Sequence, residues 1–340
     1  MLRLPTFMVK KIQIQNFKSI KNLTLPAKRI NIFIGEPNSG KSNILEALSL
    51  FAIPTVGYLS KLVRYDTFRS LFYNNSLKDE ISIKMDESYA TLTFKENKPT
   101  LDIGSNDRSF KFEPTKDGKY WWINTNGKYS VEPLIADDLF RRYKPYHFSV
   151  YSPPQEEERP LDYLQPPLGG NLFEIIESNK LLKEIVAGIV KEKGYRLNLD
   201  TSRQEINMIR DEGDVLFTYP YKSFSDTIQR VIFYLAVLES NLDSVIILEE
   251  PEANTFPYYT KYLAERIALD NNNNQFFITT HNPYLLVSLV EKTEIEDLVV
   301  NVVFMKNYAT TVRQLTRDEL PEILNLTSDF FFNLDEFIEE

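Results

Sequence analysis

The chain has 340 residues with a formal net charge of −9, and 43% of them are hydrophobic, which is ample for a buried core. It contains no cysteine, which excludes a disulfide framework and any thiolate metal site, and no stretch reaches the roughly 20 apolar residues that a membrane span needs. We therefore expect a cytoplasmic protein without a membrane partner, and the acidic balance does not indicate a nucleic-acid partner, although a small basic cluster near the N-terminus leaves one open.

The first part of the chain predicts strands on either side of a loop rich in glycine. Residues 9–17 alternate apolar and polar side chains, as a half-buried strand does, and residues 29–34 are more continuously apolar, as expected of a strand covered on both faces. Helical spacing over residues 44–51 predicts a helix that Pro54 stops. Short alternating runs over residues 81–131 then predict an antiparallel meander of hairpins.

The second half predicts alternating helices and strands. Residues 146–151 read as a strand, residues 171–193 as one long amphipathic helix, and residues 204–220 as a hairpin. Beyond them, helices are expected at 226–240, 257–269 and 283–292, and buried strands at 244–250, 275–280 and 298–305, the last of which closes the sheet. Such alternation favours parallel strands joined by helical crossovers.

The loop after the strand at residues 29–34 matches the phosphate-binding pattern G-x-x-x-x-G-K-[ST] and opens a helix. Two glycines let successive backbone N–H groups converge on phosphate oxygens, to which the helix N-terminus adds its dipole. Lys41 would reach the β- and γ-phosphates, and the Ser42 hydroxyl would ligate magnesium. The alternative is a chance match in an ordinary turn. The expected nucleotide-binding residues of this loop are Gly35, Glu36, Pro37, Asn38, Ser39, Gly40, Lys41, Ser42 and Asn43.

Two later strands end in polar residues that suit the same chemistry. Glu249 and Glu250 follow one apolar strand, at the edge of a parallel sheet where ligands bind. Glu249 is placed to hold magnesium, and Glu250 to orient or deprotonate the attacking water. His281 ends the next strand, where contact with the γ-phosphate or the water is expected. A solvated acid pair and a structural histidine are the alternatives.

Together these motifs resemble the ABC-type ATPase heads of the SMC, RecF and OLD superfamily, and most closely the short members without coiled coils that occur in bacterial phage-defence operons. The resemblance covers residues 9 to 305 and rests on "IGEPNSGKSNILEAL", "SFSDTIQRVIFYLAVLE", "VIILEEPEANTFP" and "ITTHNPYLL". It implies an α/β fold with a mainly parallel core sheet and an N-terminal antiparallel β subdomain. It also implies ATP and magnesium as cofactors, and a homodimer in which two heads pack head-to-tail around ATP.

The resemblance assigns further roles along the chain. The glycine loop matches Walker A, Glu249 matches Walker B, Glu250 matches the catalytic glutamate and His281 the switch histidine. Ser225 matches the signature serine, which reaches the γ-phosphate of the partner subunit's nucleotide. Gln155 is the candidate for the Q-loop ligand of magnesium, with an ordinary loop glutamine as the equal alternative.

Two departures from the family pattern predict slow hydrolysis. Asp226 and Thr227 stand where the signature normally offers glycine, and Asp226 would repel a close phosphate. Ser225 can still cap the following helix. Glu249 is one methylene longer than the usual aspartate, which shifts the magnesium shell. Both departures leave ATP binding intact.

These features divide the chain into four segments: 1–150 with the glycine loop and β-meander, 151–222 as a connection, 223–315 with the remaining motifs, and an acidic tail over 316–340. The tail is too short for a nuclease domain, and its aromatic residues are expected to pack on the protein itself. A separate effector, either a nuclease or a toxin, is therefore the expected partner.

Two main functions remain open from the sequence. The first is an ATPase that dimerises around ATP and controls a partner effector, in phage defence or DNA repair. The second is a nucleotide-gated scaffold that binds ATP with little hydrolysis and sequesters a toxin or nuclease. A RecF-like sensor of DNA structure is weakened by the acidic charge. A kinase-type enzyme would need a separate acceptor pocket.

Overall fold

A six-stranded sheet lies at the centre of the molecule, and every strand but one runs parallel to its neighbours. The computed structural model describes residues 8–96, 98–106, 108–115, 121–125, 128–130, 138–153 and 161–338. The strand order of the central sheet is β10 (Tyr143–Tyr146), β14 (Val245–Glu249), β15 (Gln275–Thr279), β3 (Ile30–Ile34), β16 (Leu298–Lys306) and the antiparallel β17 (Ala309–Gln314). The mainly parallel core sheet that the sequence predicts is therefore confirmed.

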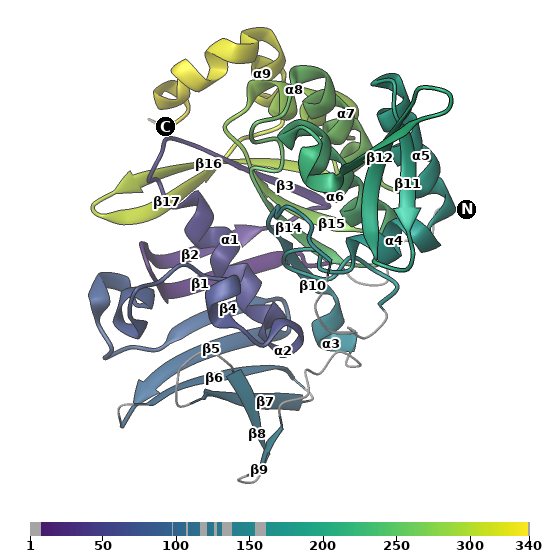
Figure 1. Cartoon of the computed structure of the whole chain (residues 1–340). Coiled ribbons are helices and arrows are strands. Elements are labelled where there is room, and N and C mark those ends of the chain that lie inside the picture. The colour runs from purple at the N-terminus through teal and green to yellow at the C-terminus, as the bar shows by residue number, and fades with distance from the viewer. Residues whose placement is uncertain are drawn as a thin grey trace.

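Helices cover one face of this sheet and an antiparallel sheet lies beyond the other (Figure 1). The covering helices are α4 (Leu172–Ser178), α5 (Lys180–Glu192), α6 (Asp226–Ser240), α7 (Pro257–Ala268), α8 (Pro283–Lys292) and α9 (Leu320–Leu326), whereas α1 (Lys41–Ser49), α2 (Ile53–Val56) and α3 (Asp138–Arg141) pack in the core on the side of the antiparallel sheet. The two faces of the central sheet support separate cores, because Ile32 packs in one buried cluster with α6, α7 and α8, whereas its neighbour Phe33 packs in the other with α1. Burial on both faces explains why β3 is apolar throughout.

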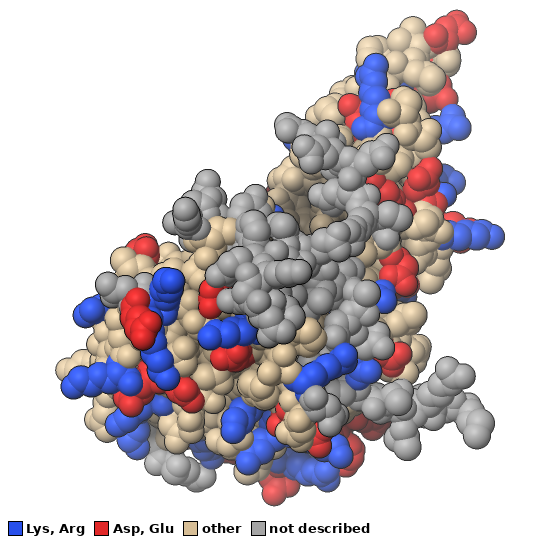
Figure 2. Space-filling view, turned by 90° about the horizontal axis from the view of Figure 1, so that it is seen from below, with Lys and Arg blue, Asp and Glu red and all other residues tan. Residues whose placement is uncertain are grey.

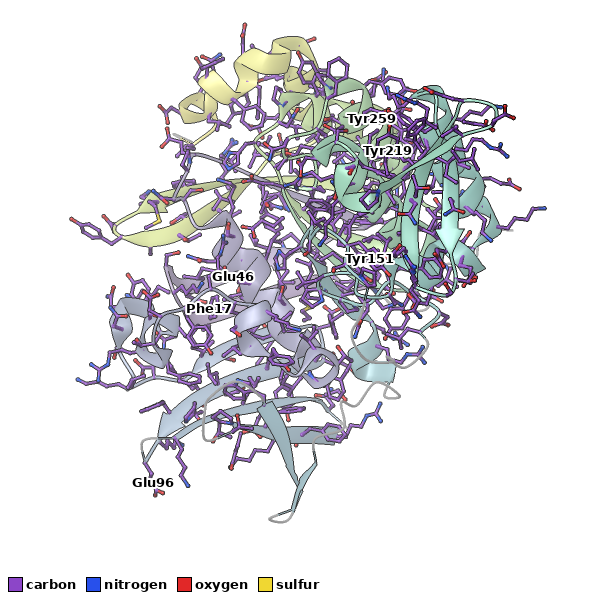
Figure 3. All side chains as sticks on the ribbon, in the orientation of Figure 1. Phe17, Glu46, Glu96, Tyr151, Tyr219 and Tyr259 are labelled. Atoms are coloured by element: carbon purple, nitrogen blue, oxygen red, sulfur yellow. The ribbon has the colours of Figure 1, made fainter. Side chains whose placement is uncertain are left out.

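The antiparallel sheet confirms the predicted meander. Its eight strands follow the order β2 (Ile20–Pro26), β1 (Lys11–Phe17), β4 (Ile81–Met85), β5 (Ser88–Lys95), β6 (Lys98–Ser105), β7 (Arg108–Pro114), β8 (Trp121–Thr125) and β9 (Lys128–Ser130). Phe17 points from this sheet toward α1, whereas Glu96 lies in the turn between β5 and β6, away from α1 (Figure 3). The glycine loop itself follows β3, so it belongs to the parallel sheet.

A third, smaller sheet precedes α6. It consists of β11 (Arg196–Asp200), β12 (Glu205–Asp211) and β13 (Leu216–Pro220), all antiparallel. The predicted hairpin is present as β12 and β13, and β11 is an additional strand. Tyr219, which is labelled in Figure 3, lies on β13 of this sheet.

Several local predictions were wrong. The strand predicted at 146–151 is instead β10, where Pro145 is tolerated because this strand lies at the sheet edge. The helix predicted at 171–193 is two helices, because Asn179 leaves helical geometry and its side chain caps α5 by accepting from the N–H of Leu182. Pro54 does not stop a helix but lies in the first turn of α2.

The end of the central sheet also differs from the prediction. The strand at 298–305 is present as β16, but β17 pairs with it and forms the edge. In the tail, Phe330, Leu334 and Phe337 are buried, as expected, while Phe332 is exposed. No helix within the described ranges is long and apolar enough to cross a membrane.

Candidate functional site: a phosphate-binding loop beside two carboxylates

The register of the parallel strands brings the predicted motifs to one edge of the sheet. Glu249 at the end of β14 pairs with Thr279 of β15, and Thr279 pairs with Phe33 of β3. The residues after these strands therefore emerge side by side, as expected at the carboxyl edge of a parallel sheet. They include the glycine loop, Glu250 and His281.

The glycine loop approaches neighbouring backbone so closely that only glycine fits at its two ends. Gly35 adopts a φ of +150°, and a Cβ added there would lie 2.0 Å from the carbonyl oxygen of Val303. Gly40 adopts a φ of +100°, and its Cβ would lie 1.9 Å from the hydroxyl oxygen of Thr310. Both glycines are thus required by geometry as well as by backbone conformation.

Lys41 turns back into its own loop. Its ammonium donates to the carbonyl oxygens of Gly35 at 2.9 Å and Glu36 at 2.7 Å. Burial lowers the pKa of Lys41 to about 8, although the nearby Glu250 and Glu249 act in the opposite direction. A phosphate would compete with these carbonyl oxygens for the same donor.

The tip of the loop is open to solvent. Glu36, Pro37 and Asn38 are exposed, whereas Ser39 is buried. Asn43 on α1 donates to the Ser19 hydroxyl at 2.7 Å, so its side chain ties the helix to the β1–β2 turn. Ser42 is half-buried in the first turn of α1.

Glu250 and His281, each predicted to act at the γ-phosphate or the attacking water, lie in contact with one another. His281 Nε2 is 3.0 Å from Glu250 Oε1, and both side chains are about two-fifths exposed, at 40% and 39%. Burial lowers the pKa of His281, and the charge of Lys41 lowers it further. Glu250 itself adopts a φ of +43°, in the left-handed region that non-glycine residues rarely occupy.

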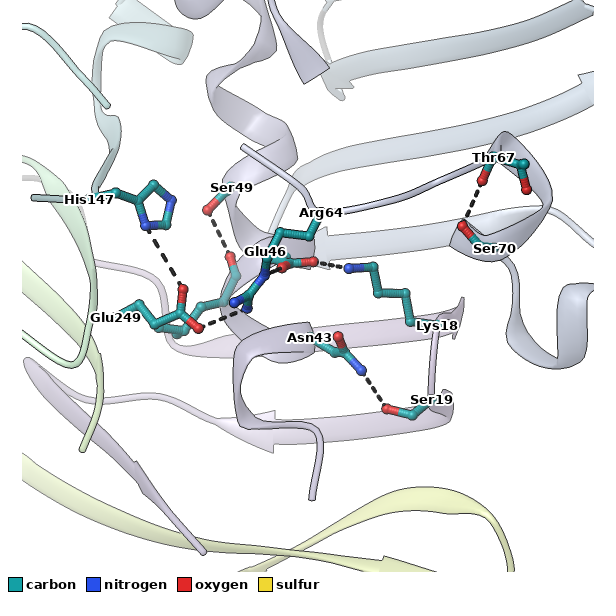
Figure 4. Close-up of polar contacts among 11 residues, drawn as sticks. Lys18, Ser19, Asn43, Glu46, Ser49, Arg64, Thr67, Ser70, His147 and Glu249 are labelled. Atoms are coloured by element: carbon teal, nitrogen blue, oxygen red, sulfur yellow. Dashed lines mark hydrogen bonds and ion pairs between the residues drawn. The ribbon is translucent and has the colours of Figure 1, made fainter. Parts of the chain in front are cut away.

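Glu249 is held by a residue that the sequence analysis does not identify. Arg64 Nη2 donates to Glu249 Oε1 at 2.8 Å, and Arg64 Nε donates to Glu46 Oε1 at 2.7 Å (Figure 4). Lys18 also donates to the buried Glu46. One guanidinium therefore connects the predicted magnesium ligand to the helix that follows the glycine loop.

His147 is a second residue missed by sequence reasoning. Its Nδ1 lies 3.9 Å from Glu249 Oε2 (Figure 4), because β10 pairs with β14 and His147 follows the residue opposite Leu248. Burial lowers the pKa of His147. The strand predicted at 146–151 placed His147 within a strand. Because β10 instead ends at Tyr146 and pairs with β14, His147 lies beside Glu249.

Ser225 stands apart from this group. Ser225 caps α6, since its Oγ accepts from the N–H of Ile228 at 3.4 Å, and among the described contacts it has none with the glycine loop. Asp226 pairs with Arg230 at 2.8 Å, so the carboxylate expected to repel phosphate has a cation one turn along α6. Gln155 lies outside the described residues.

The donor set around Glu249 suits magnesium. Ser42 and Glu249 offer oxygen ligands, which magnesium prefers, and phosphate oxygens and waters usually complete its shell. Within the described part of the chain, no group of three or more His, Asp or Glu side chains forms a metal site by itself. The residues therefore fit an ion held jointly with a phosphate.

The basic cluster near the N-terminus does not form a continuous surface. Lys18 pairs with Glu46, Arg29 pairs with Asp297 at 2.9 Å, and Lys28 donates to two backbone carbonyls. On the face seen in Figure 2, Lys and Arg side chains are interspersed with Asp and Glu. Neither observation favours a broad nucleic-acid surface.

Comparisons with known proteins agree with this geometry. The family model described as "AAA domain, putative AbiEii toxin, Type IV TA system" matches residues 30–288. MJECL10 of Methanocaldococcus jannaschii, a protein of uncharacterised function, is 36% identical over 102 residues. An "ATP/GTP phosphatase" of Helicobacter pylori is 31% identical over 108 residues. These alignments cover 26% and 28% of this chain, and only 47% and 27% of the two relatives.

Solved structures show the fold. An Smc head domain with an extended coiled coil, derived from Pyrococcus furiosus and bound to the C-terminal domain of ScpA, aligns with a TM-score of 0.51 at 14% identity, over 93% of this chain and 98% of that chain. An SMC head domain from Thermotoga maritima aligns with a TM-score of 0.43 at 13% identity, over 91% of this chain and 100% of that chain. At 14% identity, the similarity to the Smc head from Pyrococcus furiosus shows a shared fold and nothing about function.

Proposed function

Because the chain belongs to the family of AAA domains described as "putative AbiEii toxin, Type IV TA system" and has the fold of an SMC-like P-loop ATPase head, we propose that it hydrolyses ATP with magnesium and closes as a homodimer around the nucleotide. The observation that carries the proposal is the shared sheet edge at which Lys41, Glu249 and the contacting pair Glu250–His281 converge. The name of the Helicobacter pylori relative, an ATP/GTP phosphatase, is consistent with nucleotide hydrolysis.

We assign roles to the side chains as follows. Lys41 leaves its loop carbonyls and binds the phosphates together with the backbone N–H groups of the loop. Ser42 and Glu249 hold magnesium, which supplies charge stabilisation at the phosphates when it is bound. Glu250 orients and deprotonates the attacking water, while His281 fixes the Glu250 carboxylate.

Exposed aromatic residues beside this site support closure of two copies. Phe256, Tyr258 and Tyr284 are 66%, 64% and 58% exposed, and they begin α7 and α8 next to the loops that carry Glu250 and His281. Large aromatic residues are enriched where protein interfaces form. In the proposed dimer, Ser225 at the start of α6 reaches the partner's nucleotide.

The proposed output is control of a separate effector in the cytoplasm, a toxin or a nuclease, in phage defence or DNA repair. The family description, which refers to a toxin–antitoxin system, supports a toxin-related partner. A nucleotide-gated scaffold with little hydrolysis is the second candidate. One observation favours it: Arg64 occupies Glu249, the proposed magnesium ligand.

The deciding experiment compares ATP turnover by the wild type, Glu250→Gln and Glu291→Gln. Loss of the base is expected to lower kcat by about 100-fold or more, while Glu291, an exposed glutamate on α8, serves as the matched control. Light scattering after size exclusion, with and without ATP, should show dimers trapped by Glu250→Gln. Tight ATP binding with no turnover in any of the three proteins would contradict the ATPase and favour the scaffold.

The interface has its own test. The double variant Phe256→Ser, Tyr284→Ser should lose the ATP-dependent dimer, whereas Leu269→Ser at the other end of α7 should keep it, because Leu269 is similarly exposed at 64% but lies away from the site. An unchanged dimer in the double variant would contradict the proposed interface.

A further inference from the structure

Glu252 is a carboxylate without a role in the site described above, and the structure buries it in the loop after β14. The residue is 3% exposed. Its Oε1 accepts a hydrogen bond from the Thr280 hydroxyl, whereas Oε2 has no hydrogen-bond partner among the described residues. A buried carboxyl without a cation or a full set of donors costs stability. Its presence here therefore calls for an explanation other than stability.

The hydrogen bonds of Glu252 lead to the residues on either side of His281. The Thr280 hydroxyl that donates to Glu252 also accepts from the backbone N–H of Asn282 at 2.9 Å. The Asn282 side chain in turn accepts from the N–H of Tyr284 at 2.8 Å and so caps α8. His281 is thus carried on a three-residue segment that is anchored at both ends, and one anchor is Glu252.

Backbone hydrogen bonds also hold the loop after β14, which carries Glu250 as well as Glu252. The N–H of Ala253 donates to the Glu250 carbonyl at 3.0 Å, and the N–H of Glu250 donates to the Thr279 carbonyl at 3.1 Å. The hydrogen bonds that join the loops after β14 and β15 include this N–H of Glu250, which also donates to the Thr279 hydroxyl at 3.3 Å, and the side-chain bond from Thr280 to Glu252. The contact between Glu250 and His281 lies between the same two loops.

We infer that Glu252 is a positioning residue, whose buried carboxyl holds the Thr280–Asn282 segment and thereby sets the position of His281 against Glu250. The catalytic consequence rests on the proposed ATPase function, whereas the positioning is a property of the free protein. Burial raises the pKa of Glu252 to about 7, which the Thr280 hydrogen bond opposes and the charge of Glu250 reinforces. A neutral carboxyl is therefore accessible near neutral pH, as suits a buried group with no cation beside it.

The histidine content of the chain allows a test that does not depend on turnover. His147 and His281 are its two histidines, so NMR of protein labelled at histidine gives two imidazole titrations, which His147→Gln and His281→Gln assign. In Glu252→Ala, loosening of the segment should expose His281 and raise its pKa by about half a unit or more toward its ordinary value. His147, on β10's side of the site, should titrate as in the wild type.

Further variants separate positioning from general loosening. Glu252→Gln keeps an acceptor for the Thr280 hydroxyl and should restore the wild-type titration of His281. Thr280→Val removes the donor and should reproduce the shift, with no further change in the double variant with Glu252→Ala. Asp270→Asn, a half-buried acid in the loop before β15 at the opposite edge of the sheet, is the control for loss of a carboxyl that burial affects.

Turnover provides the second measurement. Glu252→Ala should lower kcat about tenfold while the Kd for ATP changes less than about threefold, since Glu252 touches neither the glycine loop nor Glu249 in the described contacts. An unchanged His281 titration in Glu252→Ala would overturn the inference, as would equal shifts at both histidines. If the alanine variant does not fold, Thr280→Val decides by the same criterion. A wild type without turnover would refute the ATPase proposal and leave the NMR result valid.

Discussion

At the scale of single residues, Lys41 is a buried cation at the centre of the proposed nucleotide site. Its ammonium is satisfied by two carbonyl groups of its own loop, yet burial holds its pKa at about 8. Phosphate groups would supply negative charge at the same point and favour the protonated form. Nucleotide binding and protonation of Lys41 are therefore linked.

This linkage predicts a pH dependence. As pH rises through about 8, the free protein loses the Lys41 proton that the complex needs, so affinity for ATP should fall by about tenfold per pH unit above that value. Titration calorimetry at fixed magnesium between pH 7 and 9 measures the effect. Lys41→Arg, which stays protonated throughout, should show a flat profile, and an equal fall in that variant would refute the link.

Arg64 gives a second prediction at this scale. Its guanidinium occupies one oxygen of Glu249, so it competes with a cation for the proposed magnesium ligand. Arg64→Ala should therefore lower the magnesium concentration for half-maximal ATP binding about threefold, with a stability change of roughly 1 kcal/mol or less because Arg64 is largely exposed. Arg69→Ala, an exposed arginine on the same segment, is the control. A higher magnesium requirement in Arg64→Ala would contradict competition.

At the scale of elements, the start of α1 depends on an unusually close approach between two strands and a helix. Thr310 on β17 donates to the carbonyl oxygen of Ser39 at 3.1 Å and lies against Gly40, while Ser19 in the β1–β2 turn bonds to Asn43. The antiparallel sheet, the edge strand and the phosphate loop thus meet at one point. A substitution that displaces Gly40 would therefore disturb the contacts among all three elements.

Substitution of glycine tests this junction. Gly40→Ala should destabilise the protein by about 3 kcal/mol and abolish ATP binding, because its Cβ meets Thr310 and its φ of +100° is unfavourable for alanine. Gly188→Ala in the exposed middle of α5 meets nothing within 4 Å and should instead stabilise by about 0.5–1 kcal/mol. Urea unfolding of both variants measures the difference, and similar effects in the two would disprove the steric account.

At the scale of the whole molecule, residues near both ends of the described chain pack against the lobe of the central sheet. The C-terminal tail, which includes α9, packs against α8, and the rings of Phe330 and Phe337 are centred 4.8 Å apart. Gln275 at the start of β15 bonds to both backbone groups of Val9, at 3.0 and 2.7 Å. The tail is thus part of the core of this lobe.

The tail gives a matched pair of substitutions. Phe330→Ala removes a fully buried ring and should cost about 3–5 kcal/mol, whereas Phe332→Ala, two residues on and 86% exposed, should change stability by less than about 0.5 kcal/mol. Thermal unfolding distinguishes them. A larger loss in the Phe332 variant would mean that the tail packs differently.

Much of the central site could be predicted from the sequence, because its parts are encoded over short distances. The glycine loop, the acidic pair and the histidine each follow a strand that is recognisable from its own apolar run, and parallel strands end at a common edge. The break at Asn179 escaped prediction, since the apolar periodicity continues through it and a single capping side chain decides the outcome.

The sequence by itself determined the phosphate-binding loop, the parallel core sheet and the placement of Glu250 and His281 at one edge of that sheet. Only the tertiary structure decided what surrounds them: Arg64 reaches Glu249 across 185 positions of the chain, His147 arrives through the pairing of β10 with β14, and Glu252 turns inward to Thr280. Periodicity and motif spacing describe the direction of a side chain within its own element. They carry no information about which distant element packs beside it, because that depends on the registers of strands formed far apart in the chain.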